Sequence, residues 1–288
     1  MGKEASALIE LLNRSSTPYA DPLERIEWES LNTQQGWWLP KGAMSLSGLP
    51  EYESLPESQR ILLSRLEFIN FIEKALWLEG IFMERISRAL GDSLGDPTAT
   101  TYRLHELREE AGHSLMFLEL IRHSGLTLSP DMFHRPKLAT WVGRFSPSDS
   151  AAFWIAVLIG EQVPDQMNRY IRRHRKEISS AIYDVITVHA IDEARHIAHA
   201  KETVETGMHS GWRVLMGLYP ALLNRIFRQF VHAFYFPSPK LYELAGLKDG
   251  KQWQARALTN PERIAFVDQC VQPTKEYLAD HGIHLKWR

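Results

Sequence analysis

The chain has 288 residues, of which 44% are hydrophobic, so it is long enough to bury a substantial core. Its 33 Lys and Arg residues nearly balance its 35 Asp and Glu residues, and the net charge of -2 argues against nucleic acid or acidic lipid and favours a small-molecule partner. The single cysteine, Cys270, excludes an intramolecular disulfide, and neither a signal peptide nor a membrane-length apolar run is present, so we expect a cytoplasmic protein without a membrane partner.

The expected elements begin with an irregular N-terminal lead-in. Residues 21–56 are rich in Pro, Gly and Trp and lack a sustained hydrophobic period, which indicates an ordered segment on the surface of something larger. Residues 54–57 combine a capping Ser, an early Pro and a Glu, and they predict a helix that continues to Gly91. Asp96 and Pro97 start a second helix in the same way, and Gly125 ends it.

Two more long helices are predicted after Gly125. Ser146 and Pro147, with Asp149, are expected to cap the third, and the fourth covers about residues 179–206. Because no alternating strand pattern occurs, we predict an all-α four-helix bundle over about residues 56–206. Further helical stretches at about 211–235 and 261–280 are expected to pack outside it, so that outer helices occupy about 211–283 of a single domain, residues 1–288.

The second and fourth helices carry the same Glu-x-x-His motif, as Glu110 with His113 and Glu193 with His196. Residues three apart share one helix face, so each pair can bind one metal ion. A chain this rich in Glu and His is expected to contain about one such pair by chance, so the motif alone is weak.

The spacing of two further glutamates is more specific. Glu79 lies 31 residues before Glu110, and Glu161 lies 32 residues before Glu193. The midpoint of each interval falls in a predicted turn, so each Glu should face its own Glu-x-x-His pair across an antiparallel hairpin. Packing the two hairpins together would bring four Glu and two His to one level of the core.

The residues around these glutamates predict burial. Leu76 and Phe82 flank Glu79, and an apolar run over residues 151–159 precedes Glu161. Unpaired buried carboxylates are costly, whereas four of them balance the charge of two divalent ions. His189, one turn before Glu193, can supply a third imidazole. Carboxylate and imidazole donors without thiolate favour iron or manganese.

Several neighbouring acidic residues compete with the candidate ligands. Glu84 lies on the same helix as Glu79, although the spacing favours Glu79. Glu106 and Glu109 are expected to be solvent-facing charges, because only Glu110 has a His three residues later.

Other residues leave two interpretations open. His189 is either a ligand or a satisfied core histidine, and its register with Glu193 favours the ligand; His105 and His199 are expected to be solvated or structural. Pro164 should kink the third helix near the metals, and this kink either shapes a cavity or is incidental. Arg225 and Arg228 are expected either to anchor a substrate carboxylate or, more commonly, to form surface ion pairs.

Taken together, these motifs resemble the p-aminobenzoate N-oxygenase family of ferritin-like di-iron proteins. The likeness extends from about residue 21 to residue 205 and includes DPLERIEW, WWLP, SLSGLP, LSRLEF, LWLE, REEAGH, IGEQ and HAIDEARH. The last motif has a His four residues before its Glu, which common ferritin-like enzymes with two His lack.

The resemblance implies a ferritin-like bundle with two iron ions, or manganese in their place, and a homodimer. The implied metal ligands are Glu79, Glu110, His113, Glu161, His189, Glu193 and His196. Asp192 is implied as a residue that accepts a hydrogen bond from a ligating imidazole and fixes its tautomer.

The same resemblance implies a monooxygenase that uses dioxygen to convert an aromatic amine through hydroxylamine and nitroso stages towards a nitro product. An external donor must supply electrons, because the sequence has no Gly-rich dinucleotide fingerprint and no iron-sulfur cysteine set. Alternatives are a di-iron hydroxylase or desaturase of a carbon substrate, or a ferritin-type iron-oxidising protein. A helical interaction module would leave the buried carboxylates unexplained.

Overall fold

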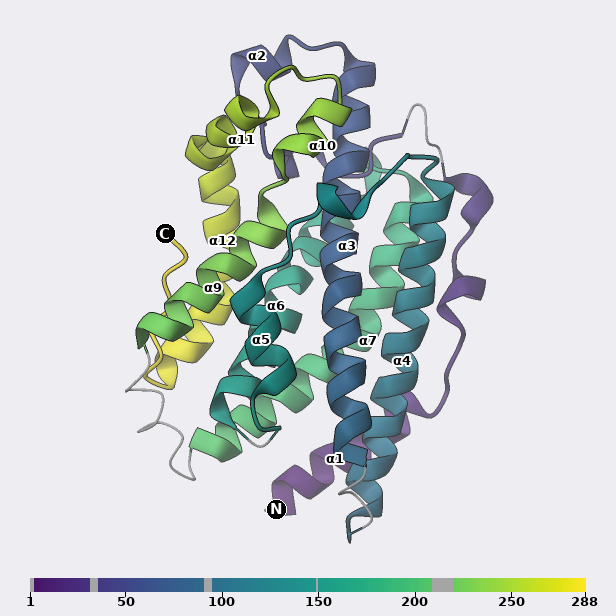
Figure 1. Ribbon diagram of the computed structural model, residues 1–288. Helices are drawn as coiled ribbons and strands as arrows, with labels where there is room; N and C mark the ends of the chain where they lie inside the picture. Colours follow the sequence, from purple (N-terminus) through teal and green to yellow (C-terminus); the bar gives the residue numbers. More distant parts are fainter. Residues whose placement is uncertain (1–2, 32–35, 91–94, 149, 209–219) are drawn as a thin grey trace.

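The computed structural model describes residues 3–31, 36–90, 95–148, 150–208 and 220–288. Its four longest helices form the predicted bundle, and no strand occurs within these ranges, so the all-α class is confirmed (Figure 1). The four are α3 (Glu57–Leu90), α4 (Pro97–His123), α6 (Ala151–Arg173) and α7 (Ser180–Gly207). α3 packs along α4, and α6 packs along α7, as two antiparallel hairpins.

The helix boundaries follow local capping chemistry. The Asp96 side chain accepts a hydrogen bond from the backbone N–H of Ala99, and Pro97 occupies the first turn of α4, as predicted. The predicted start of the third helix was too early. Ser150 caps α6, whereas Ser146 ends a separate short helix, α5 (Lys137–Phe145); Asp149 lies outside the described residues.

Side chains of α3 lie against a glycine of α6. A Cβ atom on Gly160 would lie 3.1 Å from side-chain atoms of Leu78 and of Phe82. The missing side chain leaves room for these two side chains of α3 beside Glu79 and Glu161. α6 then continues as one helix across Pro164.

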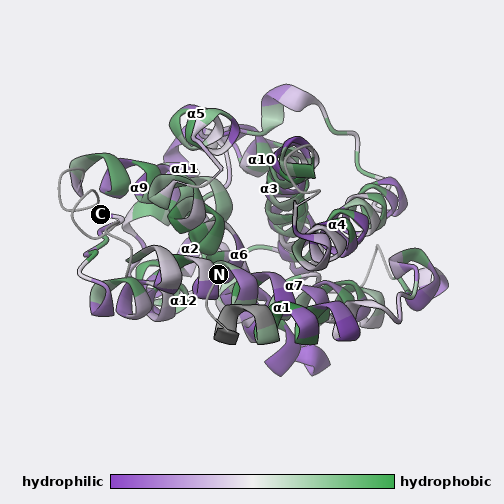
Figure 2. Cartoon of the chain, turned by 90° about the horizontal axis from the view of Figure 1, so that it is seen from below, coloured by the Kyte–Doolittle hydropathy of each residue, from purple (hydrophilic) through white to green (hydrophobic). Residues whose placement is uncertain are grey.

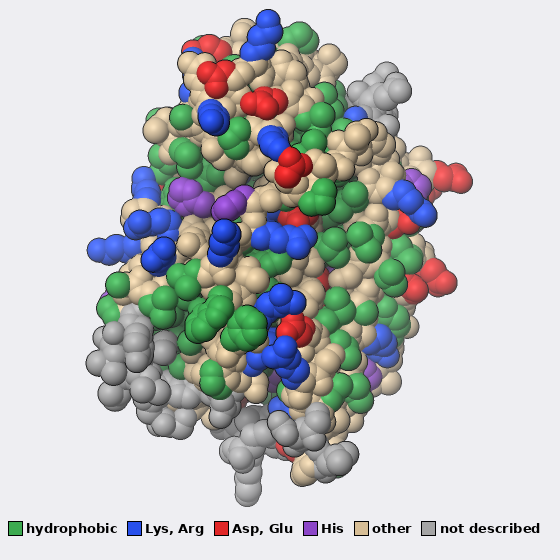
Figure 3. Space-filling model, in the orientation of Figure 1, with side chains coloured by type: hydrophobic (Ala, Val, Ile, Leu, Met, Phe, Trp, Pro, Cys, Tyr) green, Lys and Arg blue, Asp and Glu red, His purple; other side chains and the backbone are tan. Residues whose placement is uncertain are grey.

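Outer helices cover one side of the bundle. They are α9 (Pro220–Tyr235), α10 (Pro239–Leu244), α11 (Gly250–Thr259) and α12 (Pro261–Asp280). α9 and α12 match the predicted outer stretches, although residues 211–219 lie outside the described ranges. Figure 2 shows hydrophobic residues mainly where the helices face one another. Hydrophobic side chains also gather at the surface near α5, where Trp141 and Phe145 are exposed (Figure 3).

The N-terminal region differs from its prediction. An unpredicted helix, α1 (Lys3–Ser16), packs against α4 and α7 at the lower end of the bundle in Figure 1. The segment after it contains short 3-10 helices at Pro22–Arg25, Trp28–Ser30 and Lys41–Ala43, and the short α2 (Pro50–Glu53).

The expectation that the lead-in lies on the surface was wrong for part of it. Trp38, Met44 and Leu46 are fully buried in the main core, because this apolar stretch fills space between the bundle and the outer helices. Among the described helices, none combines the length and apolar character needed to cross a membrane.

Candidate metal centre

The structure brings all seven predicted ligands into one buried cluster inside the four-helix bundle. Each is at most 7% exposed. They are Glu79 on α3, Glu110 and His113 on α4, Glu161 on α6, and His189, Glu193 and His196 on α7.

Four of these residues form one donor group. Ligand atoms of Glu79, His113, His189 and Glu193 lie within 4.8 Å of one another. The His189 Nε2 atom is 3.0 Å from Glu193 Oε1 and 3.3 Å from Glu79 Oε1, and His113 Nδ1 is 3.4 Å from Glu193 Oε1. Two carboxylates and two imidazoles at this spacing fit one divalent ion.

A second donor group adjoins the first and shares Glu193 with it. Ligand atoms of Glu110, Glu193 and His196 also lie within 4.8 Å of one another. His196 Nδ1 is 3.1 Å from Glu110 Oε1 and 3.4 Å from Glu193 Oε2. Glu193 therefore presents one oxygen to each group. Glu161 belongs to neither group, but its carboxyl lies close enough to Glu193 to feel that charge.

The electrostatics of the cluster favour cations. Burial raises the pKa of the Glu79 and Glu161 carboxyls well above the ordinary value, and the charges of Glu110 and Glu193, respectively, add to the shift. Burial alone would lower the pKa of His196, but Glu110 and Glu193 raise it well above its ordinary value. Metal ions would replace the protons that these groups otherwise retain.

Unpartnered atoms in the cluster fit the same interpretation. Five of its buried atoms have no hydrogen-bond partner among the described residues: Glu110 Oε2, His113 Nδ1, Glu193 Oε1, Glu193 Oε2 and His196 Nδ1. Buried polar atoms in native proteins are normally satisfied. Each of these atoms belongs to a candidate ligand, so two bound ions would satisfy them together.

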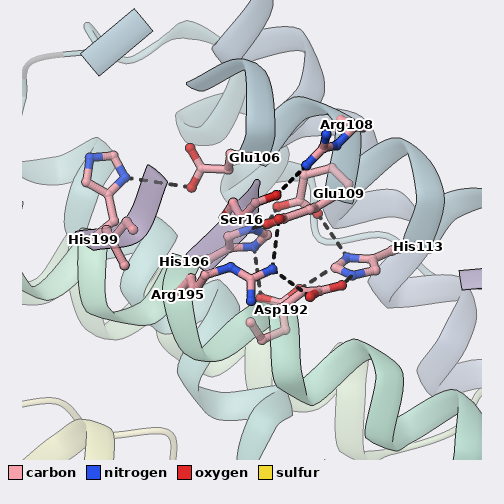
Figure 4. A network of polar contacts seen from close by, with 12 residues as sticks. Ser16, Glu106, Arg108, Glu109, His113, Asp192, Arg195, His196 and His199 are labelled. Carbon is pink, nitrogen blue, oxygen red and sulfur yellow. Dashed lines mark hydrogen bonds and ion pairs between the residues drawn. The ribbon is translucent and has the colours of Figure 1, made fainter. Parts of the chain in front are cut away.

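The Nε2 atoms of His113 and His196 each lie close to a carboxylate outside the donor groups. His113 Nε2 is 3.2 Å from Asp192 Oδ2, and His196 Nε2 is 3.0 Å from Glu109 Oε2. Arg195 donates hydrogen bonds to both carboxylates, at 2.8 Å to Glu109 and 2.6 Å to Asp192. Figure 4 shows Arg195 reaching both carboxylates, with His113 and His196 each facing one. This arrangement would hold each Nδ1 towards the donor groups.

The prediction that Glu109 faces solvent was wrong. Its side chain is buried, because it turns from α4 towards His196 and Arg195 on α7. The sequence contained a signal for this role: Glu109 directly precedes Glu110, just as Asp192 directly precedes Glu193. Both motifs are therefore acid-Glu-x-x-His, and each acid contacts the histidine of the other motif.

His189 is oriented by a neighbour of a different kind. Its Nδ1 atom is 3.2 Å from the side-chain nitrogen of Asn168, while its Nε2 atom faces Glu79 and Glu193. The side-chain oxygen of Asn168 has no hydrogen-bond partner among the described residues. Turning the amide over would let that oxygen accept a hydrogen bond from Nδ1.

Other residues considered as ligands or substrate contacts in the sequence lie outside the cluster. Glu84 is paired with Arg88 and Arg144 near the surface. Arg225 and Arg228 are exposed on α9, away from the cluster and from the cavity described next.

A cavity of about 480 Å³ adjoins the cluster. Glu110 and Glu161 reach it, and its apolar walls include Phe82, Phe153 and Trp154. Ile9 of α1 also lines it, so the unpredicted helix helps to close it. Glu106 lines the cavity as well and is only 9% exposed, so the expectation that it faces solvent was also wrong. A small organic molecule can bind here next to the candidate metal centre.

Buried carboxylates and imidazoles on four antiparallel helices define a ferritin-like protein with the donor set of a two-metal centre. The sequence matches the family described as "P-aminobenzoate N-oxygenase AurF" over residues 2–282, and the chain belongs to this family. The resemblance seen in the sequence is thereby confirmed.

Curated relatives and solved structures are more distant. "Uncharacterized protein Rv0885" of Mycobacterium tuberculosis and "Uncharacterized protein Mb0909" of Mycobacterium bovis are each 26% identical over 199 residues. Each alignment covers 66% of this chain and 56% of the relative, so the chain spans little more than half the length of these relatives.

Similar solved structures include mutants of an R2-like ligand-binding oxidase. One, with an anaerobically reconstituted Mn/Fe cofactor, has a TM-score of 0.54 at 13% identity and 92% coverage of both chains. Another, with a non-activated Mn/Mn cofactor, has a TM-score of 0.52 at 14% identity and the same 92% coverage of both chains. At these identities the likeness supports the fold.

Proposed function

We propose that the protein is a dimetal oxygenase that uses dioxygen to oxidise a small organic molecule, and that its reaction is N-oxygenation of an aromatic amine. The observation that carries the proposal is the cavity that reaches Glu110 and Glu161, beside two donor groups that share Glu193. Membership of the N-oxygenase family supports the choice of an amine nitrogen as the oxidised atom.

The proposed metal ligands are the seven residues of the cluster. Iron is the proposed metal, with manganese as the alternative, since the donors are carboxylates and imidazoles. Bound metal would supply the redox chemistry that reduces dioxygen. The carboxylates of the cluster would balance the charge of two divalent ions.

The chain itself would bind and orient the substrate. Phe82, Phe153 and Trp154 provide apolar surface for an aromatic ring and exclude water from it. The amine nitrogen would then point towards Glu110 and Glu161, at the inner end of the cavity. Asp192 and Glu109 would keep the two imidazoles in a fixed tautomer during turnover.

The first oxidation must consume two electrons and two protons from an external donor. One N–H bond of the amine is replaced by an N–O bond, which gives a hydroxylamine, and the second oxygen atom leaves as water. A second candidate reaction is hydroxylation of a carbon atom, because the apolar walls suit a hydrocarbon as well as an aryl ring.

Anaerobic loading with ferrous iron, followed by a reductant and isotopically labelled dioxygen, tests these reactions. We expect two metal ions per chain and labelled oxygen on the nitrogen of an arylamine, detected by mass spectrometry. A hydrocarbon of the same shape, such as toluene against aniline, is the matched control. Labelled oxygen only on carbon would favour the second candidate, and fewer than two ions per chain would contradict both.

A further inference from the structure

One wall of the cavity is polar, and the reaction proposed above does not use it. Tyr102 and Glu106 of α4 and His199 of α7 all line the cavity. Tyr102 is fully buried, and within the described part of the chain neither its hydroxyl nor His199 Nδ1 has a hydrogen-bond partner. Figure 4 shows Glu106 and His199 facing each other, at 3.7 Å between Glu106 Oε1 and His199 Nδ1.

The position of these groups follows from helix geometry. Glu106 lies four residues, about 6 Å along the axis, from Glu110, and His199 lies three residues beyond His196. The polar wall therefore repeats the Glu–His pairing of the candidate metal centre one turn further from it. That offset is close to the length of a benzene ring with its para substituents.

The imidazole is held in place by aromatic neighbours. Edge contacts surround the His199 ring, with centroids 4.9 Å from Tyr102 and 5.2 Å from Trp154. A ring held in this way beside a carboxylate is a preorganised recognition site. The 3.7 Å separation is too long for a direct hydrogen bond, so a small polar group of a ligand can bond to both residues.

The Glu106 carboxylate disfavours an anionic group at this wall, because like charges repel. Glu106 and Glu202 both line the cavity. The Arg85 guanidinium, which also lines the cavity, donates to the backbone carbonyls of Arg144 and Ser146 and lies over Phe153. Arg103 is not free either.

We propose that Tyr102, Glu106 and His199 select aromatic amines that carry a neutral hydrogen-bonding group, such as a hydroxyl, at the end opposite the oxidised nitrogen. The hydroxyl would donate to the Glu106 carboxylate and accept from His199 or Tyr102. A methyl group would leave these buried groups unsatisfied, and a carboxylate would be repelled by Glu106. The choice of amines rests on the proposed oxygenase function.

Three ligands of the same shape test the selection: 4-aminobenzyl alcohol, 4-toluidine and 4-aminobenzoate. Calorimetric titration of the iron-loaded protein without oxygen should show the alcohol binding about tenfold more tightly than either of the others. Tyr102→Phe and Glu106→Gln should each remove most of this preference while changing the affinity for 4-toluidine less than about twofold. Glu84→Gln, outside the cavity, is the control and should keep the preference.

Tightest binding of 4-aminobenzoate by the parent protein would overturn the proposal. An equal loss of affinity for all three ligands in Tyr102→Phe, which removes only one oxygen atom, would also overturn it, because that pattern indicates a structural role. Selective binding of the alcohol without N-oxygenation would contradict the proposed function and leave this selection standing. N-oxygenation of all three amines, bound with equal affinity, would support the proposed function and contradict this selection.

Discussion

At the scale of single residues, the acid before each Glu-x-x-His motif links the two halves of the candidate centre. Glu109 contacts His196, Asp192 contacts His113, and Arg195 bonds to both acids. An imidazole that donates its Nε2 proton to a carboxylate presents a more basic Nδ1 to a metal. We therefore expect the two acids to affect metal affinity, although neither belongs to the donor groups.

We predict that Glu109→Gln and Asp192→Asn each weaken metal binding by roughly 10- to 100-fold, because a neutral amide no longer supports the charge on its imidazole. Competition with a chelator of known affinity measures the effect. Glu84→Gln, which changes a glutamate that is paired near the surface, should leave affinity unchanged. Parent-like affinity in both variants would show that the acids serve packing alone.

A pH dependence follows from the histidines of the metal-free protein. Burial alone would lower the pKa of His113, but the nearby carboxylates of Asp192 and Glu110 raise it to about 9. Because folding raises the pKa of His113, its protonated ring stabilises the folded state fully at pH values below its pKa in the unfolded chain, about 6.5. This stabilisation is lost as the pH rises to about 9. The raised pKa of His196 acts in the same direction.

We therefore predict that metal-free protein loses on the order of a few kcal/mol of unfolding free energy between pH 6.5 and 9. Denaturant titrations at a series of pH values measure this loss. Metal-loaded protein should show a weaker dependence, because the ions replace the protons. Stability of the metal-free form that rises with pH over this range would contradict the assignment of charges.

At the scale of elements, a glycine on α6 makes room for side chains of α3 next to the cluster. Gly160 sits where a side chain would meet Leu78 and Phe82, and Phe82 also lines the cavity. Glu79 and Glu161 project from these same helices. A side chain at position 160 would therefore displace Leu78 and Phe82. We expect this displacement to disturb both the two proposed ligands and the cavity.

We predict that Gly160→Val destabilises the protein by about 1–3 kcal/mol through overpacking and lowers metal content. The matched control is Gly80→Ala on α3, where a new Cβ has no neighbour within 4 Å. That change should stabilise the helix by about 0.5–1 kcal/mol. Thermal melts and elemental analysis of both variants check these predictions, and equal effects would show that Gly160 is not tightly packed against Leu78 and Phe82.

At the scale of the whole molecule, a buried polar network joins the lead-in to the C-terminal helices. Arg263 of α12 donates to the backbone carbonyls of Ala43 and Tyr235. Ser45 donates to Glu67 of α3 through its backbone N–H and its hydroxyl. Burial raises the pKa of Glu67, and the positive charge of Arg263 opposes this shift. The network ties chain segments far apart in sequence into one core.

We propose on this basis that residues 1–288 unfold as a single domain. Arg263→Met should lower the unfolding free energy by about 3–5 kcal/mol, because it leaves buried acceptors and Glu67 uncompensated. Calorimetry should show one transition for parent and variant. Arg288→Ala, which removes a surface ion pair with Asp268, should change stability by less than about 1 kcal/mol. Two separate transitions in the variant would contradict a single domain.

The sequence by itself determined the four long helices and the level of the candidate ligands. Caps such as Asp96 act on their own helix, so they are visible locally. Helical rise per residue is constant, so the intervals from Glu79 to Glu110 and from Glu161 to Glu193 place each pair at one height in an antiparallel hairpin.

Only the tertiary structure decided which other residues face the centre and its cavity. Glu109 is buried because its partners His196 and Arg195 come from a helix almost ninety residues later. Trp38 is buried because a lead-in with no period of its own fills a space that other elements create. Local patterns record the preferences of one segment, whereas burial and polar pairing depend on what the rest of the chain brings beside it.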